Sequence, residues 1–253
     1  MKIATWNVNG IRARQGQLLD WLATEKPDIV CLQEIKAHID QLPFELRDLD
    51  GYYAGWHGDK GYSGVGLLVA RSLVAAPPVY THPPFDFEQR VISAELDFGK
   101  GPVVTSSFYV PNGGKDYDAK IRFLTAMDAW AAEHQAAGRP LLFCGDLNVA
   151  RTDMDIHPKE RKVNQVGARD DERALIERLL SRGLVDVGRT LHPSDDAFFT
   201  WWAPWRNLKQ RNIGWRLDYL FASHALAERA VSCAVQREFG TSDHGPVVAV
   251  FDA

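Results

Sequence analysis

Residues 141–148 read LLFCGDLN, an apolar run that leads through a glycine into two polar side chains. The run has the composition of a buried strand, and Gly145 is typical of the point where such a strand ends. A core strand does not need the carboxylate of Asp146 or the amide of Asn148. In sheets that are covered by helices, ligand sites lie at strand ends of this kind. The stretch therefore predicts a buried strand of an α/β fold, with a candidate site at its end.

The same pattern recurs along the chain. Further apolar runs, bounded by Gly, Pro, Asn or Asp, are Lys2–Trp6, Asp28–Gln33, Gly64–Ala70, Val91–Leu96, Pro102–Val110, Leu217–Ala222 and Pro246–Phe251. Helical periodicity appears around Leu18–Leu22, Phe123–Ala131 and Leu175–Leu180, and Gly183 can end the last helix. The proline-rich stretch Ala76–Pro84 predicts a rigid loop. Strands mixed with helices predict one α/β domain over residues 1–253, with sheets covered by helices.

Composition excludes several classes of protein. Of the 253 residues, 45% are hydrophobic and 25% are charged, which is enough apolar material for a buried core. The 29 basic and 33 acidic residues give a net charge of −4, which excludes a uniformly basic coat but not a local basic face. We expect no membrane span and no signal peptide, and hence a cytoplasmic protein. Cys31 and Cys144 lie in apolar runs and no CxxC spacing occurs, so neither disulfides nor structural zinc are expected.

Polar side chains stand at the ends of several predicted strands. Each one taken alone has an ordinary structural explanation as a turn or capping residue. Together they form a set of amides and carboxylates with one histidine and one tyrosine: Asn7, Asn9, Glu34, Tyr109, Asn112, Asp146, Asn148, Asp218, Asp243 and His244. Because strand ends gather ligand sites in α/β sheets, we expect these side chains to lie together.

The chemistry of this set favours a hard cation. Oxygen ligands without cysteine suit Mg²⁺ or Mn²⁺ better than zinc. A metal, a carboxylate base and a histidine are the groups needed for phosphodiester hydrolysis, in which a water attacks phosphorus in line. A serine hydrolase is the competing interpretation, but the chain has no G-x-S-x-G motif, since in GYSGVG (61–66) a glycine directly follows the serine.

A basic and aromatic segment precedes one of these strands. Between positions 206 and 216 there is no acidic residue, and the basic residues are Arg206, Lys209, Arg211 and Arg216. Trp201, Trp202, Trp205 and Trp215 lie within or beside this stretch. This composition is typical of a surface that contacts phosphates and stacks or inserts aromatic rings. A solvated loop with buried tryptophans would have the same composition, so that alternative stays open.

Seven blocks of sequence resemble the exonuclease III family of abasic-site DNA endonucleases, within the endonuclease/exonuclease/phosphatase superfamily. In chain order they are WNVNGIRAR, PDIVCLQEIK, GYSGV, FYVPN, GDLNVA, NIGWRLDYLFAS and SDHGPV, and they extend from Trp6 to Val247. The wider superfamily shares QE, GDxN and SDH, whereas GWRLDY is more particular to the DNA-repair branch. The resemblance implies a DNase I-like four-layer α/β sandwich, in which two packed mixed sheets are flanked by helices.

The resemblance also implies a metal site and a catalytic set. The metal-site residues would be Asn7, Glu34, Asp146, Asn148, Asp243 and His244, with Glu34 as the principal ligand. The catalytic residues would be Tyr109, Asp146, Asn148, Asp218 and His244. In these roles Asp146 is the base for the attacking water and Asp218 holds His244 against the phosphate. Asn9 stands where family members carry Asp, so it is not counted as a ligand.

The implied function is a Mg²⁺-dependent DNA repair phosphodiesterase, with Mn²⁺ as a substitute, that acts as a monomer on double-stranded DNA. It would cleave 5′ of abasic sites to leave a 3′-hydroxyl and a 5′-deoxyribose phosphate, and would also act on 3′ ends as a 3′–5′ exonuclease or end-cleaning enzyme. The DNA contacts would be Lys36, Tyr62, Arg90, Asn112, Trp201, Trp205, Arg206, Lys209, Arg211, Trp215 and Leu217. The alternatives are a phosphatase or phosphodiesterase on a non-DNA substrate, such as an inositol lipid or sphingomyelin, and a catalytically silent DNA-binding module.

Overall fold

Two six-stranded sheets form the centre of the protein, of which the computed structural model describes residues 1–252. The strand order in the first sheet is β11 (Ala230–Val235), β12 (Val247–Phe251), β1 (Lys2–Asn7), β2 (Ile29–Gln33), β4 (Tyr62–Ala70) and β3 (Tyr52–Asp59). In the second it is β5 (Tyr80–Thr81), β6 (Val91–Asp97), β7 (Pro102–Tyr109), β8 (Leu141–Asp146), β10 (Asp218–Ser223) and β9 (Leu184–Asp186). Both sheets are mixed, because β1 pairs with β2 and β7 with β8 in parallel, while their other pairings are antiparallel.

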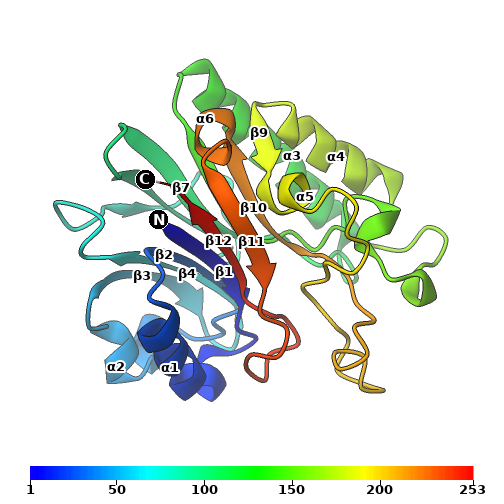
Figure 1. The fold of residues 1–253 in the computed structure, drawn as a ribbon, viewed down its shortest axis with the longest axis horizontal. Helices are drawn as coiled ribbons and strands as arrows, with labels where there is room; N and C mark the ends of the chain where they lie inside the picture. Colours follow the sequence, from blue (N-terminus) through cyan, green and yellow to red (C-terminus); the bar gives the residue numbers. More distant parts are fainter. Residues whose placement is uncertain (253) are drawn as a thin grey trace.

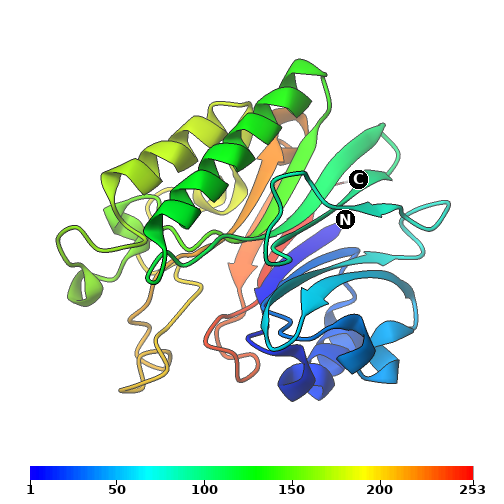
Figure 2. The same ribbon diagram turned by 180° about the vertical axis from the view of Figure 1, so that it is seen from behind.

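Helices cover the outer face of each sheet (Figures 1 and 2). On the first sheet these are α1 (Gln15–Glu25) and α2 (Phe44–Arg47), whose apolar residues pack on β1, β2 and β4. On the second sheet they are α3 (Tyr117–Ala136) and α4 (Asp170–Leu180), which pack on β6, β7, β8 and β10. The short helices α5 (Val187–Leu191) and α6 (His224–Ala227) lie close to β10 and β9. The resulting order is helix, sheet, sheet, helix, so the predicted four-layer sandwich is confirmed.

The apolar runs are continuous because both faces of the central strands are buried. In β8, Leu142 and Cys144 enter the core between the two sheets, whereas Leu141 and Phe143 pack on the outer side beneath α3 and α4. All the cysteines lie in the core between the sheets and are free, as expected for small hydrophobic side chains. No helix within residues 1–252 is long and apolar enough to cross a membrane.

All eight predicted strands are present, and their ends differ from the predicted ones by at most two residues. Elements not predicted from the sequence are the edge strands β3, β9 and β11, the short helices α2, α5 and α6, and β5, which interrupts the predicted loop Ala76–Pro84. The missed strands are short or only partly buried, so they lack the continuous apolar run that reveals a central strand.

Strand direction brings the polar strand ends together. In the first sheet, Asn7 at the end of β1 is in register with Gln33 at the end of β2. In the second, Asp146 at the end of β8 lies between Tyr109 on β7 and Asp218 on β10. Because the two sheets pack face to face, both groups of polar side chains meet at one edge of the sandwich.

Candidate active site

Asn7 joins the two sheets at the centre of the site. Its fully buried amide nitrogen donates to Glu34 Oε1 and to Asp146 Oδ2, each at 2.9 Å. Its amide oxygen accepts from the backbone nitrogen of Asn9 at 3.0 Å, which fixes the orientation of the amide. Asn7 therefore holds one carboxylate from each sheet within reach of the same ligand.

Asp146 is a buried carboxylate surrounded by donors. Its Oδ1 accepts from the backbone nitrogen of Asn148 at 2.9 Å, and His244 Nε2 lies 3.8 Å from its Oδ2. Burial raises the pKa of Asp146, and the neighbouring carboxylates of Asp218 and Glu34 add to the increase, while His244 opposes it. A carboxylate with a raised pKa is a better acceptor for a proton from water than an exposed one.

Asp218 fixes the ring of His244. The Nδ1–H of His244 donates to Asp218 Oδ2 at 2.8 Å, so Nε2 is directed towards the site. Burial alone would lower the pKa of His244, but the charges of Asp218 and Asp146 outweigh it and raise the pKa to about 10. His244 is therefore a cation at neutral pH, and it can donate a hydrogen bond from Nε2 to an anion.

Asn9 connects Asp243 to Lys36 beside the carboxylates. Its amide nitrogen donates to Asp243 Oδ1 at 2.8 Å, and its amide oxygen accepts from Lys36 Nζ at 2.7 Å. An amide can do both at once, whereas an aspartate at this position could not donate to Asp243. The Lys36 ammonium also lies 2.7 Å from Glu34 Oε2. Burial alone would raise the pKa of Glu34. Hydrogen bonds from Asn7 and Lys36 outweigh this effect, so the pKa of Glu34 is lower than its usual value.

Several residues of this site adopt backbone conformations that are rare for side chains other than glycine. The φ angles of Asn9, Glu34, Lys36 and Asn148 lie between 46° and 52°. Each such residue costs about 1 kcal/mol or more, and strained residues of this kind gather at functional sites. In this fold they turn the chain sharply at strand ends, so that side chains from β1, β2 and β8 point to a common centre.

Three of the predicted metal-site residues offer ligand atoms in one place. Atoms of Glu34, Asp146 and His244 all lie within 4.8 Å of one another. Two carboxylate oxygens suit a divalent cation, and the Asn7 amide turns its nitrogen, not its oxygen, towards them. Asp243 accepts hydrogen bonds from Trp201 Nε1 at 3.0 Å and from Asn9 Nδ2 at 2.8 Å, so both of its carboxylate oxygens already have protein partners. The residues present therefore fit a metal held chiefly by Glu34, with Asp146 beside it.

Tyr109 and Arg90 line an adjoining cavity of ≈ 560 Å³. The Arg90 guanidinium lies 4.7 Å from the Tyr109 ring centroid and donates to the Tyr62 phenol oxygen at 3.0 Å. Burial raises the pKa of Tyr109 well above its usual value, and the charges of Glu34 and Asp146 add to the effect. Tyr109 is thus a neutral hydrogen-bond donor at neutral pH. On the same side, Asn112 Nδ2 donates to Asn148 Oδ1 at 3.2 Å.

The segment between positions 201 and 217 has a buried base and an exposed tip. Trp215 and Leu217 are buried in an apolar cluster with Ile156, and Trp201 packs against it. The Trp201 ring centroid lies 6.4 Å from that of His244, so this cluster adjoins the catalytic group. At the tip, 59% of Trp205 is exposed. Arg206 and Arg211 are also exposed, whereas Lys209 is half-buried and donates to Ser242 O at 2.8 Å.

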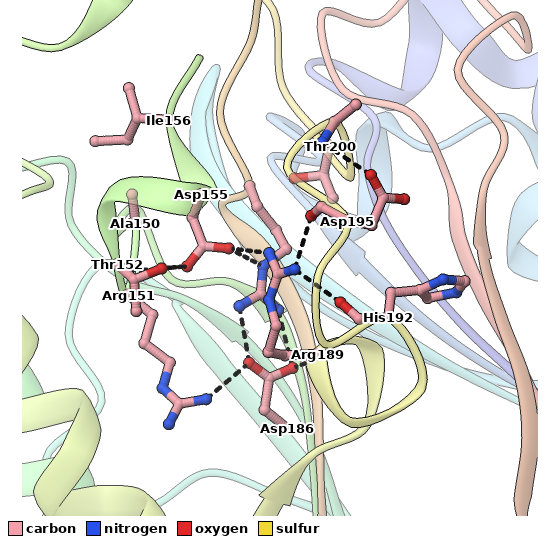
Figure 3. Close-up of polar contacts among 12 residues, drawn as sticks. Ala150, Arg151, Thr152, Asp155, Ile156, Asp186, Arg189, His192, Asp195 and Thr200 are labelled. Carbon is pink, nitrogen blue, oxygen red and sulfur yellow. Dashed lines mark hydrogen bonds and ion pairs between the residues drawn. The ribbon is translucent and has the colours of Figure 1, made fainter. Parts of the chain in front are cut away.

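Arg216 does not belong to the basic surface that the sequence pattern suggested. It is buried and donates to Asp155 Oδ1 at 2.7 Å and to both Asp186 carboxylate oxygens at 2.8–2.9 Å. Arg189 donates to Asp155 Oδ1 at 2.6 Å, and Arg151 pairs with Asp186 at 3.4 Å (Figure 3). Trp202 is also buried. The alternative of buried tryptophans therefore holds for the base of the segment, while its tip is exposed and carries basic and aromatic residues.

A buried ion pair that no sequence pattern predicted supports the site. Lys120 on α3 and Glu172 on α4 are both fully buried, and Lys120 Nζ lies 2.5 Å from Glu172 Oε1. Lys120 also donates to the backbone oxygens of Asn148 at 2.7 Å and Asn112 at 3.2 Å. It therefore fixes the backbone of two predicted site residues. The pattern of α3 gives no signal for this role, because its hydrophobic face looks like that of an ordinary helix.

The comparisons with known proteins agree with this geometry. A model of the endonuclease/exonuclease/phosphatase family matches residues 4–244. The exodeoxyribonuclease of Bacillus subtilis strain 168 is 32% identical over 260 residues, which cover 100% of both chains. An AP endonuclease structure from Archaeoglobus fulgidus has a TM-score of 0.85 and 32% identity. The structure of the 3′ phosphatase NExo from Neisseria, bound to a product DNA hairpin, has a TM-score of 0.89 and 31% identity. Both structural matches cover 100% of each chain.

Two independent findings thus agree on the relationship. The family model covers nearly the whole chain, including every residue of the carboxylate, amide and histidine set. The exodeoxyribonuclease of Bacillus subtilis and the AP endonuclease of Archaeoglobus fulgidus match from end to end, and both are nucleases by name. The resemblance to the exonuclease III group is therefore confirmed, and the chain belongs to the endonuclease/exonuclease/phosphatase family.

Proposed function

We propose that this protein is a Mg²⁺-dependent DNA repair phosphodiesterase that cleaves 5′ of abasic sites to leave a 3′-hydroxyl and a 5′-deoxyribose phosphate, and that also processes 3′ ends. The observation that carries the proposal is the cluster of Glu34, Asp146 and His244, which adjoins the apolar cluster containing Trp215 and Leu217. We further propose that residues 1–253 form one such domain and that it acts as a cytoplasmic monomer. Mn²⁺ would substitute for Mg²⁺.

The chemical step follows from the charge states of the site. A Mg²⁺ ion near Glu34 would supply positive charge to the phosphate. Asp146, with its raised pKa and with its second oxygen held by Asn148, accepts the proton of the attacking water. Asn7 keeps Asp146 and Glu34 in position through two hydrogen bonds, so the base does not need to reorganise during the reaction.

Two further donors stabilise the phosphate. His244, kept cationic by Asp218, donates from Nε2 to a phosphate oxygen as negative charge develops. Tyr109 donates its phenol proton to phosphate or to the leaving oxygen, and burial keeps this group neutral. Arg90, stacked on Tyr109 and paired with Glu88 at 2.7 Å, offers a guanidinium on the same side.

Selection of an abasic site would depend on the apolar cluster beside His244. An enzyme that acts on a nucleotide within a duplex turns it out of the stack, and a missing base makes this step cheap. We propose that Trp201, Trp215 and Leu217 surround the bare deoxyribose and leave no room for a base. The exposed Trp205 is suited to insertion into the duplex, and Arg206, Lys209 and Arg211 to phosphate contacts. Lys36, Tyr62 and Asn112 would contact further phosphates.

A duplex with one tetrahydrofuran abasic analogue tests the proposal. We expect nicking 5′ of the analogue with Mg²⁺, no nicking with EDTA, and loss of nicking in Glu34→Gln. Binding without nicking in the presence of Mg²⁺ would instead identify a silent DNA-binding module. Release of phosphate from an inositol lipid or sphingomyelin analogue, with no action on the duplex, would favour the non-DNA enzyme of the same superfamily.

A further inference from the structure

A second group of metal-binding side chains lies away from the active site, where the edges of the two sheets meet. His57 comes from the edge strand β3 of the first sheet, while His82 and Asp86 come from the connection between β5 and β6 of the second. Their candidate ligand atoms all lie within 4.8 Å of one another. The rings of His57 and His82 are stacked, with centroids 3.6 Å apart and planes inclined by 22°.

The surroundings of these side chains have the pattern of a metal site. His82 Nδ1 lies 3.0 Å from the backbone oxygen of Val91, so this nitrogen donates and Nε2 is available as a ligand. Asp86 Oδ1 accepts from the backbone nitrogens of Arg90 at 2.8 Å and Val91 at 2.9 Å, which leaves Oδ2 for other contacts. Histidine ligands in metal sites commonly donate their second nitrogen to a carbonyl, and ligating carboxylates are themselves held by hydrogen bonds.

We propose that His57, His82 and Asp86 bind a transition-metal cation of the Zn²⁺ type, at a site separate from the active site. Two imidazoles and one carboxylate favour Zn²⁺ over Mg²⁺, which prefers oxygen ligands. His82 is exposed, so a water can complete a tetrahedral set at the open position. This donor set thus distinguishes the second site from the two-carboxylate cluster of the active site.

Binding requires the stacked rings of His57 and His82 to turn, so that one nitrogen of each points at the metal. His57 Nε2 and Asp86 Oδ2 are 2.6 Å apart, joined by a hydrogen bond. Two ligands at ~2.0 Å from a tetrahedral zinc lie about 3.3 Å apart, so the pair must separate by well under 1 Å. The proton on His57 Nε2 moves to Nδ1 or to water as the metal enters, because the metal needs the lone pair of that nitrogen.

The site would connect the two sheets at their open edge. His57 belongs to one sheet, and His82 and Asp86 to the connection before β6 of the other. A metal bound to all three therefore restrains this edge, and it also restrains the start of β6, because Asp86 holds the backbone of Arg90. We expect Zn²⁺ to stabilise the folded chain, since it binds a site that the unfolded chain lacks.

Zinc calorimetry and Co²⁺ visible absorption test the site in the Glu34→Gln chain, in which the active-site cluster is weakened. We expect one equivalent of Zn²⁺ to bind, a tetrahedral Co²⁺ spectrum, and a higher unfolding temperature with Zn²⁺. Adding His82→Ala or His57→Ala should lower the zinc affinity at least about 10-fold and abolish the thermal shift. Asp86→Asn keeps an acceptor for the Arg90 and Val91 backbone nitrogens, so it removes the ligand charge without removing these hydrogen bonds.

His38→Ala is the matched control, because His38 also lies beside a carboxylate, with its Nδ1 3.2 Å from Asp40, but has no second histidine in the group. It should leave zinc binding unchanged. The inference is wrong if the Glu34→Gln chain binds no zinc, or if His57→Ala and His82→Ala bind it as tightly as their parent. Either result would leave the proposed nuclease function untouched, since that function uses the separate cluster.

Discussion

Replacing Lys120 by Met should destabilise the protein strongly, because the change leaves Glu172 buried without its cation. Both side chains are fully buried, and their charged atoms lie 2.5 Å apart. Removing one partner of a buried pair typically costs 3–5 kcal/mol. Glu172 keeps backbone donors from Gly167 at 2.8 and 3.0 Å and from Arg169 at 3.0 Å, which offset part of the loss. We therefore expect a loss of about 3 kcal/mol in the free energy of unfolding.

Urea denaturation followed by tryptophan fluorescence measures this loss. The double variant Lys120→Met/Glu172→Gln leaves a neutral amide in place of the stranded carboxylate, so it should recover about 1–2 kcal/mol relative to Lys120→Met alone. Lys162→Met, at an exposed position, is the control and should change stability by less than about 0.5 kcal/mol. The reasoning fails if Lys120→Met costs less than about 1 kcal/mol, or if the double variant is no more stable than the single one.

Other consequences of the geometry can be tested in the same way. Asp146→Asn should lower the single-turnover rate of abasic cleavage by several orders of magnitude while DNA affinity is kept, and near-normal cleavage would contradict its role as the base. The pKa of His244 is raised from 6.5 to about 10 in the fold, so its contribution to stability is complete below pH ~6.5 and is lost as pH rises towards 10. Denaturation between pH 6 and 10 should show this loss in the wild type and a smaller one in His244→Asn. Trp215→Ala should enlarge the apolar pocket and reduce the ratio of cleavage rates for abasic and intact duplexes, and an unchanged ratio would count against the pocket. Asn9→Asp loses the donor to Asp243 and adds negative charge beside Glu34, so half-maximal activity should need less Mg²⁺. An unchanged or higher Mg²⁺ requirement would contradict this electrostatic effect.

The central strands and their polar ends were predictable because burial on both faces leaves a strong signal in the sequence. The run Leu141–Gly145 has no polar side chain, and the polar residues begin directly after it at Asp146. The edge strand β3 gave no such signal, since most of its residues are only half-buried and it contains two glycines. Edge strands are also stabilised by whatever packs beside them, which a local pattern does not contain.

Charged residues were harder to place than apolar ones. Arg206 and Arg216 look alike in the sequence, yet the first is exposed and the second is enclosed between Asp155 and Asp186. The difference depends on partners that lie 61 and 30 positions from Arg216 in the chain. A buried arginine requires carboxylate partners of this kind, and no local sequence pattern predicts where they are. The same reason hides the Lys120–Glu172 pair.

The segment between Trp201 and Trp215 has a fixed base and a tip that can vary independently of it. Their backbones exchange hydrogen bonds at 2.9 Å in both directions, and Arg216 fastens the chain immediately after them. The pairing of Trp201 with Trp215 therefore closes the base of the loop, while the tip of the loop extends away from the sheets in Figure 1. Insertions or deletions between the two tryptophans can alter the length and charge of the tip without moving the paired base of the loop. Natural or engineered changes in the tip would therefore alter how the protein binds DNA and leave the chemistry of the site intact.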